Sequence, residues 1–135
     1  MIYGIGNDVL ETERVRLILE SPRRTSFINR LLTKREQDLL YSRNKDELAY
    51  VSGRFAAKEA ITKAFGCGIG RIIGFQDLEI LPDEKGKPIV SLTADAWQRL
   101  ELTGGPEYQI HLSISHQSTV ATAFAIVERI DKTAE

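Results

Sequence analysis

The sequence predicts an α+β fold in which a mainly antiparallel sheet packs against one long central helix. Three stretches support this prediction: a helix-periodic segment over residues 47–65, strict alternation over residues 108–116, and a nearly all-apolar run over residues 119–127. A 3.6-residue period indicates a helix, alternation indicates a half-buried strand, and a short run that is apolar on both faces indicates an inner strand. A chain of 135 residues is expected to form a single domain, spanning residues 1–135.

The first third of the chain is expected to begin as a strand and to continue as a helix. Residues 1–10 contain strand-forming apolar residues, and Gly4 and Gly6 among them indicate a bulge or the close approach of another backbone. Residues 11–20 are amphipathic, and the helix that they predict ends before Pro22. Arginines are frequent in this region, namely Arg14, Arg16, Arg23, Arg24 and Arg30. Surface arginines are commonly just solvated, but such a cluster also suits an acidic partner protein.

Two helices are expected in the middle of the chain. Thr33 and Glu36 match the capping-box pattern, so a helix begins there and continues to about residue 43. Polar residues interrupt it before the long helix begins at residue 47. The glycine-rich residues 66–70 stop the long helix. They form either a glycine C-cap or a loop whose amides face a phosphate.

β-structure dominates the remainder of the chain. Residues 78–81 and 89–92 are predicted to pair as a hairpin, and Thr93 is placed to cap a short helix after it. The two long strands described above follow, and the charged residues 128–135 are expected to fray.

The central helix divides into two halves when it is viewed down its axis. The apolar half contains Ala56, Ala57, Ala60, Ile61, Ala64 and Phe65, and its small side chains allow close approach to a sheet. The polar half contains Arg54, Lys58, Glu59, Thr62 and Lys63, while Phe55 lies on the wrong side. Three cations around one carboxylate suit a surface that binds phosphates and shares a divalent metal with another acid. The alternative is a solvated face with Glu59 and Lys63 as an i,i+4 ion pair.

Composition excludes several classes of function. The chain has 18 Lys and Arg against 19 Asp and Glu, so a net charge of -1 provides no general basic field for nucleic acid or a membrane. Its single cysteine, Cys67, excludes an internal disulfide and a thiolate metal cage. No signal peptide is recognised in residues 1–10, and no apolar run approaches the roughly 20 residues that span a bilayer. A cytoplasmic protein is therefore expected.

Few residues outside the central helix have surroundings that suggest chemistry. Asp8 lies among apolar residues near the end of its strand, so it needs a partner or caps the next helix. His116 stands at a strand end, where a lone histidine is more often structural than functional. The glycines lack the spacing of a dinucleotide-binding or P-loop motif, and nothing pairs a serine, a histidine and an aspartate as a catalytic triad.

Four sequence blocks nevertheless resemble one enzyme family. They are residues 4–9 (GIGNDV), 53–60 (GRFAAKEA) followed by 63–66 (KAFG), 75–80 (FQDLEI) with 86–88 (GKP), and 112–116 (LSISH). In order and spacing they look like the holo-acyl-carrier-protein synthases, the small class of 4′-phosphopantetheinyl transferases. The resemblance extends over residues 2–128 and implies the fold of that family.

The resemblance also implies a reaction. Members of the family transfer the 4′-phosphopantetheine of coenzyme A to a serine of apo-acyl carrier protein, which releases adenosine 3′,5′-bisphosphate and supports fatty acid biosynthesis. By similarity, Asp8 and Glu59 hold Mg²⁺ against the pyrophosphate, and Glu59 and Lys63 are the catalytic residues. The residues similar to those that bind coenzyme A are Arg54, Lys58, Lys63, Gly66, Pro88 and His116. Either a metal-bound water or Glu59 is the general base.

The assembly is implied in the same way. Family members are homotrimers with sites between subunits, and basic residues of the first helix dock the acidic carrier, for which Arg14 and Arg24 are the candidates here. Either Arg43 or Lys45 is expected to meet the 3′-phosphate of coenzyme A.

Two other classes of function remain open on the residues alone. A magnesium-dependent nucleotide pyrophosphatase would use the same acids with water as the nucleophile, and a non-catalytic nucleotide-binding domain would need no metal. The combination of Asp8, Glu59 and Lys63 with a basic first helix favours the transferase.

Overall fold

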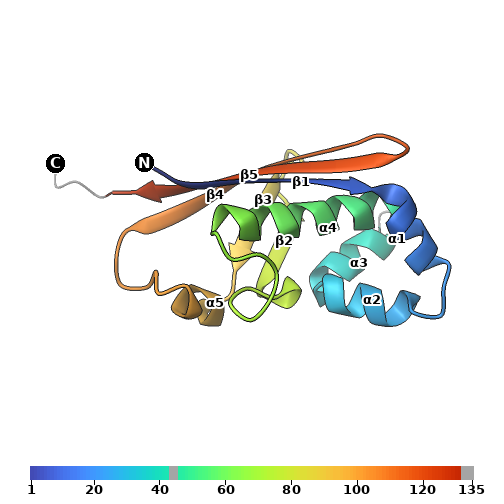
Figure 1. Ribbon diagram of the computed structural model, residues 1–135, viewed down its shortest axis with the longest axis horizontal. Coiled ribbons are helices and arrows are strands. Elements are labelled where there is room, and N and C mark those ends of the chain that lie inside the picture. Colours follow the sequence, from blue (N-terminus) through green and yellow to red (C-terminus); the bar gives the residue numbers. More distant parts are fainter. Residues whose placement is uncertain (43–45, 132–135) are drawn as a thin grey trace.

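The long helix lies across one face of an antiparallel sheet, as the sequence predicts. The computed structural model describes residues 1–42 and 46–131. Its main sheet has the order β1-β5-β4, built from β1 (Ile2–Glu11), β5 (Val120–Ile130) and β4 (Glu107–His116). Helix α4 (Glu47–Ala64) runs along the sheet (Figure 1). Because β5 pairs with a strand on each side, the prediction of an inner strand there is confirmed.

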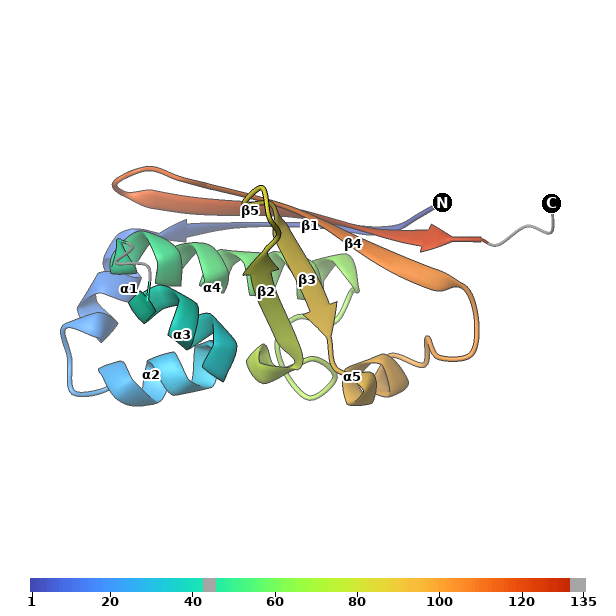
Figure 2. The same ribbon diagram turned by 180° about the vertical axis from the view of Figure 1, so that it is seen from behind.

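The remaining helices gather on the side of α4 that faces away from the sheet, and a second, two-stranded sheet extends from that side toward β4 (Figures 1 and 2). Near the first residues of α4 lie α1 (Thr12–Leu19), α2 (Arg24–Leu31) and α3 (Lys34–Ser42). The second sheet is the predicted hairpin, β2 (Leu78–Pro82) with β3 (Pro88–Leu92), and the 3₁₀-helix η1 (Phe75–Asp77) precedes it. Helix α5 (Ala94–Arg99) follows the hairpin, with Thr93 capping it through the amide of Ala96.

Glycines allow α4 to approach β1 closely. A Cβ atom added at Gly4 would lie 1.8 Å from the carbonyl oxygen of Ala64, and one added at Gly6 would lie 2.0 Å from that of Ala60. Both distances are far below van der Waals contact, so any side chain there would push helix and strand apart. The register also shifts between Ile2 and Gly4. Both expectations for these glycines, a bulge and a close approach, are therefore confirmed.

Helix α4 is covered on two faces, which corrects one expectation. Lys58 and Thr62, assigned to its solvent-facing half, are both completely buried. The second cover comes from α2 and η1: the ring of Phe55 lies between those of Phe27 and Phe75, with centroid distances of 6.2 and 5.6 Å. The position of Phe55 on the polar half therefore marks this second buried face.

A buried ion pair ties that cover together. The ammonium of Lys58 donates to Glu36 Oε1 at 2.8 Å and to the carbonyl oxygens of Leu31 at 2.7 Å and Phe75 at 3.0 Å. All three of its protons are thus used inside the protein. Burial lowers the pKa of Lys58 below its usual value, and the neighbouring Glu36 opposes this effect.

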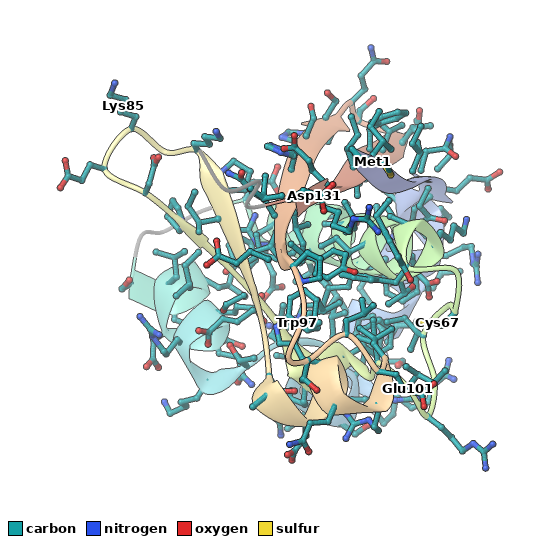
Figure 3. All side chains as sticks on the ribbon, turned by 90° about the vertical axis from the view of Figure 1, so that its left-hand side faces the viewer. Met1, Cys67, Lys85, Trp97, Glu101 and Asp131 are labelled. Carbon is teal, nitrogen blue, oxygen red and sulfur yellow. The ribbon has the colours of Figure 1, made fainter. Side chains whose placement is uncertain are left out.

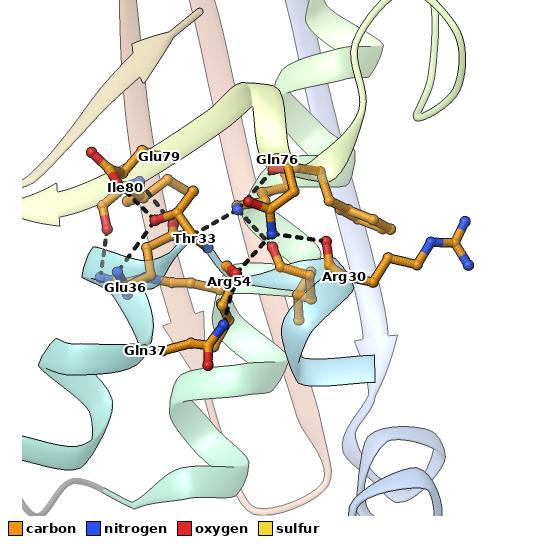
Figure 4. A network of polar contacts seen from close by, with 12 residues as sticks. Arg30, Thr33, Glu36, Gln37, Arg54, Gln76, Glu79 and Ile80 are labelled. Carbon is orange, nitrogen blue, oxygen red and sulfur yellow. Dashed lines mark hydrogen bonds and ion pairs between the residues drawn. The ribbon is translucent and has the colours of Figure 1, made fainter. Parts of the chain in front are cut away.

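The carboxylate of Glu36 has further partners, which are drawn in Figure 4. Its Oε1 accepts from the amide of Thr33 at 2.8 Å, and its Oε2 accepts from the amide of Ile80 at 2.9 Å. The Thr33 hydroxyl accepts in return from the Glu36 amide at 3.3 Å, so the predicted capping box is confirmed. The same glutamate thus caps α3 and joins it to α4 and β2.

One predicted boundary differs from the structure, and another falls outside the described residues. Residues 128–130 were expected to fray, but they belong to β5: all three pair with β4, and Glu128 also pairs with β1. Residues 132–135 lie outside the described residues. Helix α3 is described as far as Ser42, and its predicted end at residue 43 falls outside the described residues. Over residues 1–42 and 46–131, no helix combines the length and apolar character that crossing a membrane requires.

Replacing Lys58 by methionine is expected to lower the free energy of unfolding by about 3–5 kcal/mol, because it leaves the Glu36 carboxylate buried and unpaired. Urea denaturation at matched protein concentration measures the change. Lys34→Met is the control, since Lys34 pairs with Asp38 at a surface where both side chains are mostly exposed. The control should unfold like the parent protein. If both variants lost the same stability, the buried pair would not have the structural role described above.

Candidate active site

Three polar residues that are distant in sequence meet where α4 crosses β1. The Nζ atom of Lys63 lies 3.1 Å from Asp8 Oδ1 and 3.1 Å from the carbonyl oxygen of Asn7. Glu59 precedes Lys63 by one helical turn, on the same side of α4. Asp8 does not cap the following helix, because the cap position is Glu11 and no side chain caps it. The alternative role for Asp8 is therefore excluded.

The electrostatics of this cluster favour a divalent cation. Partial burial raises the pKa of the Glu59 carboxyl, the charge of Asp8 raises it further, and Lys63 opposes both effects. Two carboxylates that destabilise each other's charge gain from a cation between them. Within residues 1–42 and 46–131, no group of three or more histidine, cysteine, aspartate or glutamate side chains is arranged to hold a metal. The pair Asp8 and Glu59 thus suits Mg²⁺, which commonly keeps waters and substrate phosphate oxygens as further ligands.

The end of α4 next to this cluster is a glycine cap. The amide of Gly66 donates to the carbonyl oxygen of Lys63 at 2.9 Å, and the amide of Cys67 donates to that of Thr62 at 3.1 Å. Gly66 has a φ of 81°, as the left-handed residue of such a cap requires. Because these two amides close the helix, the predicted glycine C-cap is confirmed. Gly66 can still line a site next to Lys63.

A second group of predicted residues lies elsewhere on the chain. Arg54, Pro88 and His116 line one hollow of about 580 Å³, between α4, the β2–β3 hairpin and β4. The guanidinium of Arg54 stacks on the ring of Tyr50 with its carbon 4.5 Å from the ring centroid. Its Nε is buried and has no hydrogen-bond partner among the described residues. A stacked, partly unsatisfied guanidinium beside an exposed histidine is suited to anionic, aromatic ligands.

The two groups lie at opposite edges of the sheet. Asp8 belongs to β1, whereas His116 belongs to β4, and β5 separates these strands. Arg54 and Glu59 are both on α4, but five residues of helix turn their side chains toward different sides of it. The fold therefore brings together Asp8, Glu59 and Lys63 at one edge and Arg54, Pro88 and His116 at the other.

Five predicted residues belong to neither group. Lys58 lines neither group, and because its protons are all donated to protein oxygens it is not placed to bind a ligand. Arg24 forms a two-bonded ion pair with Glu47, which joins α2 to the start of α4. Arg14 is exposed on α1 and has no ion pair or side-chain hydrogen bond with the described residues. Arg43 and Lys45 lie outside the described residues.

Some residues that shape the site were not anticipated from the sequence. Tyr50, which supports Arg54, was read as an ordinary residue of the long helix. Glu36 was predicted as a helix cap, but its pairing with Lys58 was not. The one signal for the second case was Phe55, an aromatic residue on the polar half of the helix close to Lys58.

Comparison with known proteins identifies the family to which this arrangement belongs. Residues 4–125 match the model of the 4′-phosphopantetheinyl transferase superfamily. A holo-[acyl-carrier-protein] synthase of Clostridium novyi is 44% identical over 128 residues, which cover 95% of this chain and 88% of the relative.

Solved structures agree with the sequence match. The holo-(acyl-carrier-protein) synthase of Bacillus anthracis, solved in complex with CoA (3′,5′-ADP), has a TM-score of 0.77 and 37% identity, covering 95% of this chain and 97% of its own. The holo-[acyl-carrier-protein] synthase of Neisseria meningitidis has a TM-score of 0.80 and 34% identity, and the match covers 95% of this chain and 99% of the Neisseria chain. The chain therefore belongs to the holo-[acyl-carrier-protein] synthase family of the 4′-phosphopantetheinyl transferase superfamily.

Proposed function

We propose that this protein, as one transferase domain, moves the 4′-phosphopantetheine group of coenzyme A to a serine of apo-acyl carrier protein. The products are holo-acyl carrier protein and adenosine 3′,5′-bisphosphate. The observation that carries the proposal is the meeting of Asp8, Glu59 and Lys63 at one sheet edge, in a chain that belongs to this family. A relative that was crystallised with CoA (3′,5′-ADP) supports coenzyme A as the donor.

The chemistry needs charge neutralisation and positioning more than covalent catalysis. The serine oxygen forms a bond to the β-phosphorus, the bond from that phosphorus to the bridging oxygen breaks, and the serine proton goes to a base. Asp8 and Glu59 would hold Mg²⁺, which supplies positive charge to the pyrophosphate oxygens when it is bound. Lys63 is placed to stabilise the departing phosphate. Glu59 or a water molecule beside it would accept the serine proton.

A site shared between subunits explains the separation of the two residue groups. On the face of the sheet away from α4, Ile5, Val9 and Phe124 are 56%, 65% and 47% exposed. An apolar sheet face of this kind favours association with another subunit. If subunits meet head to tail, the β1 edge of one lies beside the β4 edge of the next, and closure produces a ring. We propose a homotrimer in which each coenzyme A is bound by Asp8, Glu59 and Lys63 of one subunit and by the Arg54, Pro88 and His116 hollow of its neighbour.

The carrier protein would dock on the subunit that supplies the metal ligands. Strand β1 ends at Glu11 and α1 begins at Thr12, so Asp8 and Arg14 are only six residues apart. Arg14 is exposed and is the first candidate for contact with an acidic carrier. Arg24 would contribute only by exchanging its partner Glu47 for an acid of the carrier. We place the reaction in the cytoplasm, as part of fatty acid and lipid biosynthesis.

The intact mass of an apo-acyl carrier protein, incubated with the enzyme, coenzyme A and Mg²⁺, tests the function. The carrier is expected to gain one phosphopantetheine, and a chelator should prevent the gain. Glu59→Gln should lower the rate at least about 100-fold, because it removes a charge that binds the metal. Glu101→Gln is the control, since Glu101 is exposed in the turn that follows α5, away from the main sheet (Figure 3).

The other two functions give different results in the same experiment. Cleavage of coenzyme A without a change in carrier mass would identify a pyrophosphatase. Binding of coenzyme A without either change, and without dependence on Glu59, would identify a binding domain. Each result would contradict the proposed transfer.

Mixing two inactive variants tests the shared site. Glu59→Gln and His116→Ala should each be strongly impaired, because each removes one side of every site. Co-expressed in equal amounts, they should recover about a quarter of the parent activity, since about one interface in four then combines two intact sides. The control combines Glu59→Gln with Asp8→Asn, which alter the same side and should recover nothing. Failure of the first pair, in trimers shown to contain both variants, would contradict a site made by two subunits.

A further inference from the structure

The two lysines in the last three turns of α4 are held in opposite ways. Lys58 is completely buried, and each of its protons has a protein acceptor. The Lys63 side chain is 50% exposed and contacts Asp8 and the Asn7 carbonyl at 3.1 Å each. An ion pair with one half-exposed partner contributes little to stability. Lys63 can therefore leave Asp8 for another partner, because its flexible four-carbon stem is half exposed, but it gives up this ion pair when it does so.

The ammonium of Lys63 occupies the surroundings that a metal ion would need. Its contact is to Oδ1 of Asp8, one of the two carboxylates that suit a divalent cation. A cation bound by both Asp8 and Glu59 would lie within a few ångströms of Nζ, where two positive charges repel each other strongly. Mg²⁺ also requires ligand oxygens at about 2.0–2.1 Å in nearly octahedral geometry. The ammonium and the metal therefore compete for Asp8.

A displaced Lys63 has one obvious destination. Coenzyme A brings phosphate oxygens to this edge under the proposed function, and an ammonium binds phosphate strongly as a point charge. The new ion pair between Lys63 and a phosphate then offsets the loss of the ion pair between Lys63 and Asp8. Metal and nucleotide would thus favour each other's binding through one side chain, and such coupling must be reciprocal.

We infer that Lys63 is an exchangeable counter-ion: it neutralises Asp8 until a divalent metal takes its place, and it then transfers to a phosphate of coenzyme A. The inference rests on the proposed function and adds to it a regulation of metal binding. Metal alone binds weakly, because it must displace Lys63 without compensation. Metal binds tightly when coenzyme A is also bound. Few protein molecules therefore hold the metal without coenzyme A.

Titration of Mn²⁺, with the free ion followed by electron paramagnetic resonance, tests the inference without an activity assay. Lys63→Met is expected to bind Mn²⁺ about tenfold more tightly than the parent protein when coenzyme A is absent. Coenzyme A should increase the Mn²⁺ affinity of both the parent protein and Lys63→Met. The fold-increase should be about ten times larger in the parent protein than in the variant. Asp8→Asn should abolish the tight site in either background, which assigns the signal to this edge of the sheet.

Two controls separate competition at Asp8 from a general effect of charge. Arg14→Met also removes a cation near Asp8 in the sequence. Among the described residues, however, the ion pair of Asp8 is with Lys63 and not with Arg14, so Mn²⁺ affinity should change less than about twofold. Lys63→Arg keeps a cation on the same turn and should restore weak binding without coenzyme A. Thermal unfolding should be similar in all three variants, since Arg14 and Lys63 are both exposed residues.

Equal Mn²⁺ affinity in Lys63→Met and the parent protein would overturn the inference, as would equal tightening by Arg14→Met. Either result would leave the proposed transfer intact, because phosphopantetheine transfer is measured separately. If Asp8→Asn left Mn²⁺ binding unchanged, the metal site itself, and with it the proposed function of Asp8, would be wrong.

Discussion

The buried ion pair between Lys58 and Glu36 is the interaction on which the arrangement of the site depends. A buried pair is weak evidence for stability when only its two charges are counted, because both must leave water. This pair also satisfies the amides of Thr33 and Ile80 and the carbonyl oxygens of Leu31 and Phe75. It therefore fastens the covering helices and the β2 strand to the middle of α4 at defined distances.

The opposite face of α4 is held in a different way. Small residues there meet the glycines of β1, so the backbones touch almost directly. This contact is close, but few side chains interlock across it, so it does little to prevent α4 from rotating about its own axis. The hydrogen bonds of Lys58 fix that rotation, because they point in defined directions. Glu59 follows Lys58 in sequence, so the anchor also orients the carboxylate that faces Asp8.

The sequence was informative wherever a structural cause was local. Strand alternation and the capping box at Thr33 and Glu36 each depend on a few neighbouring residues, and both were predicted. The pairing of Asp8 with the helix was suggested by an acid in apolar surroundings and by the family resemblance. Lys58 was misplaced because a helical projection assumes one buried face, whereas the second cover comes from distant aromatic residues such as Phe27 and Phe75. The division of the site between two sheet edges also needed the strand order, which the sequence does not contain.

The central claim is that Asp8 and Glu59 together form the metal site at the β1 edge. Crystals grown with coenzyme A and Mn²⁺ would test it most directly, through the anomalous scattering of manganese. The account predicts one strong anomalous peak within coordination distance of both carboxylates and of a pyrophosphate oxygen. A peak beside other residues, or a well-ordered coenzyme A at this edge with no manganese on Asp8 and Glu59, would contradict it.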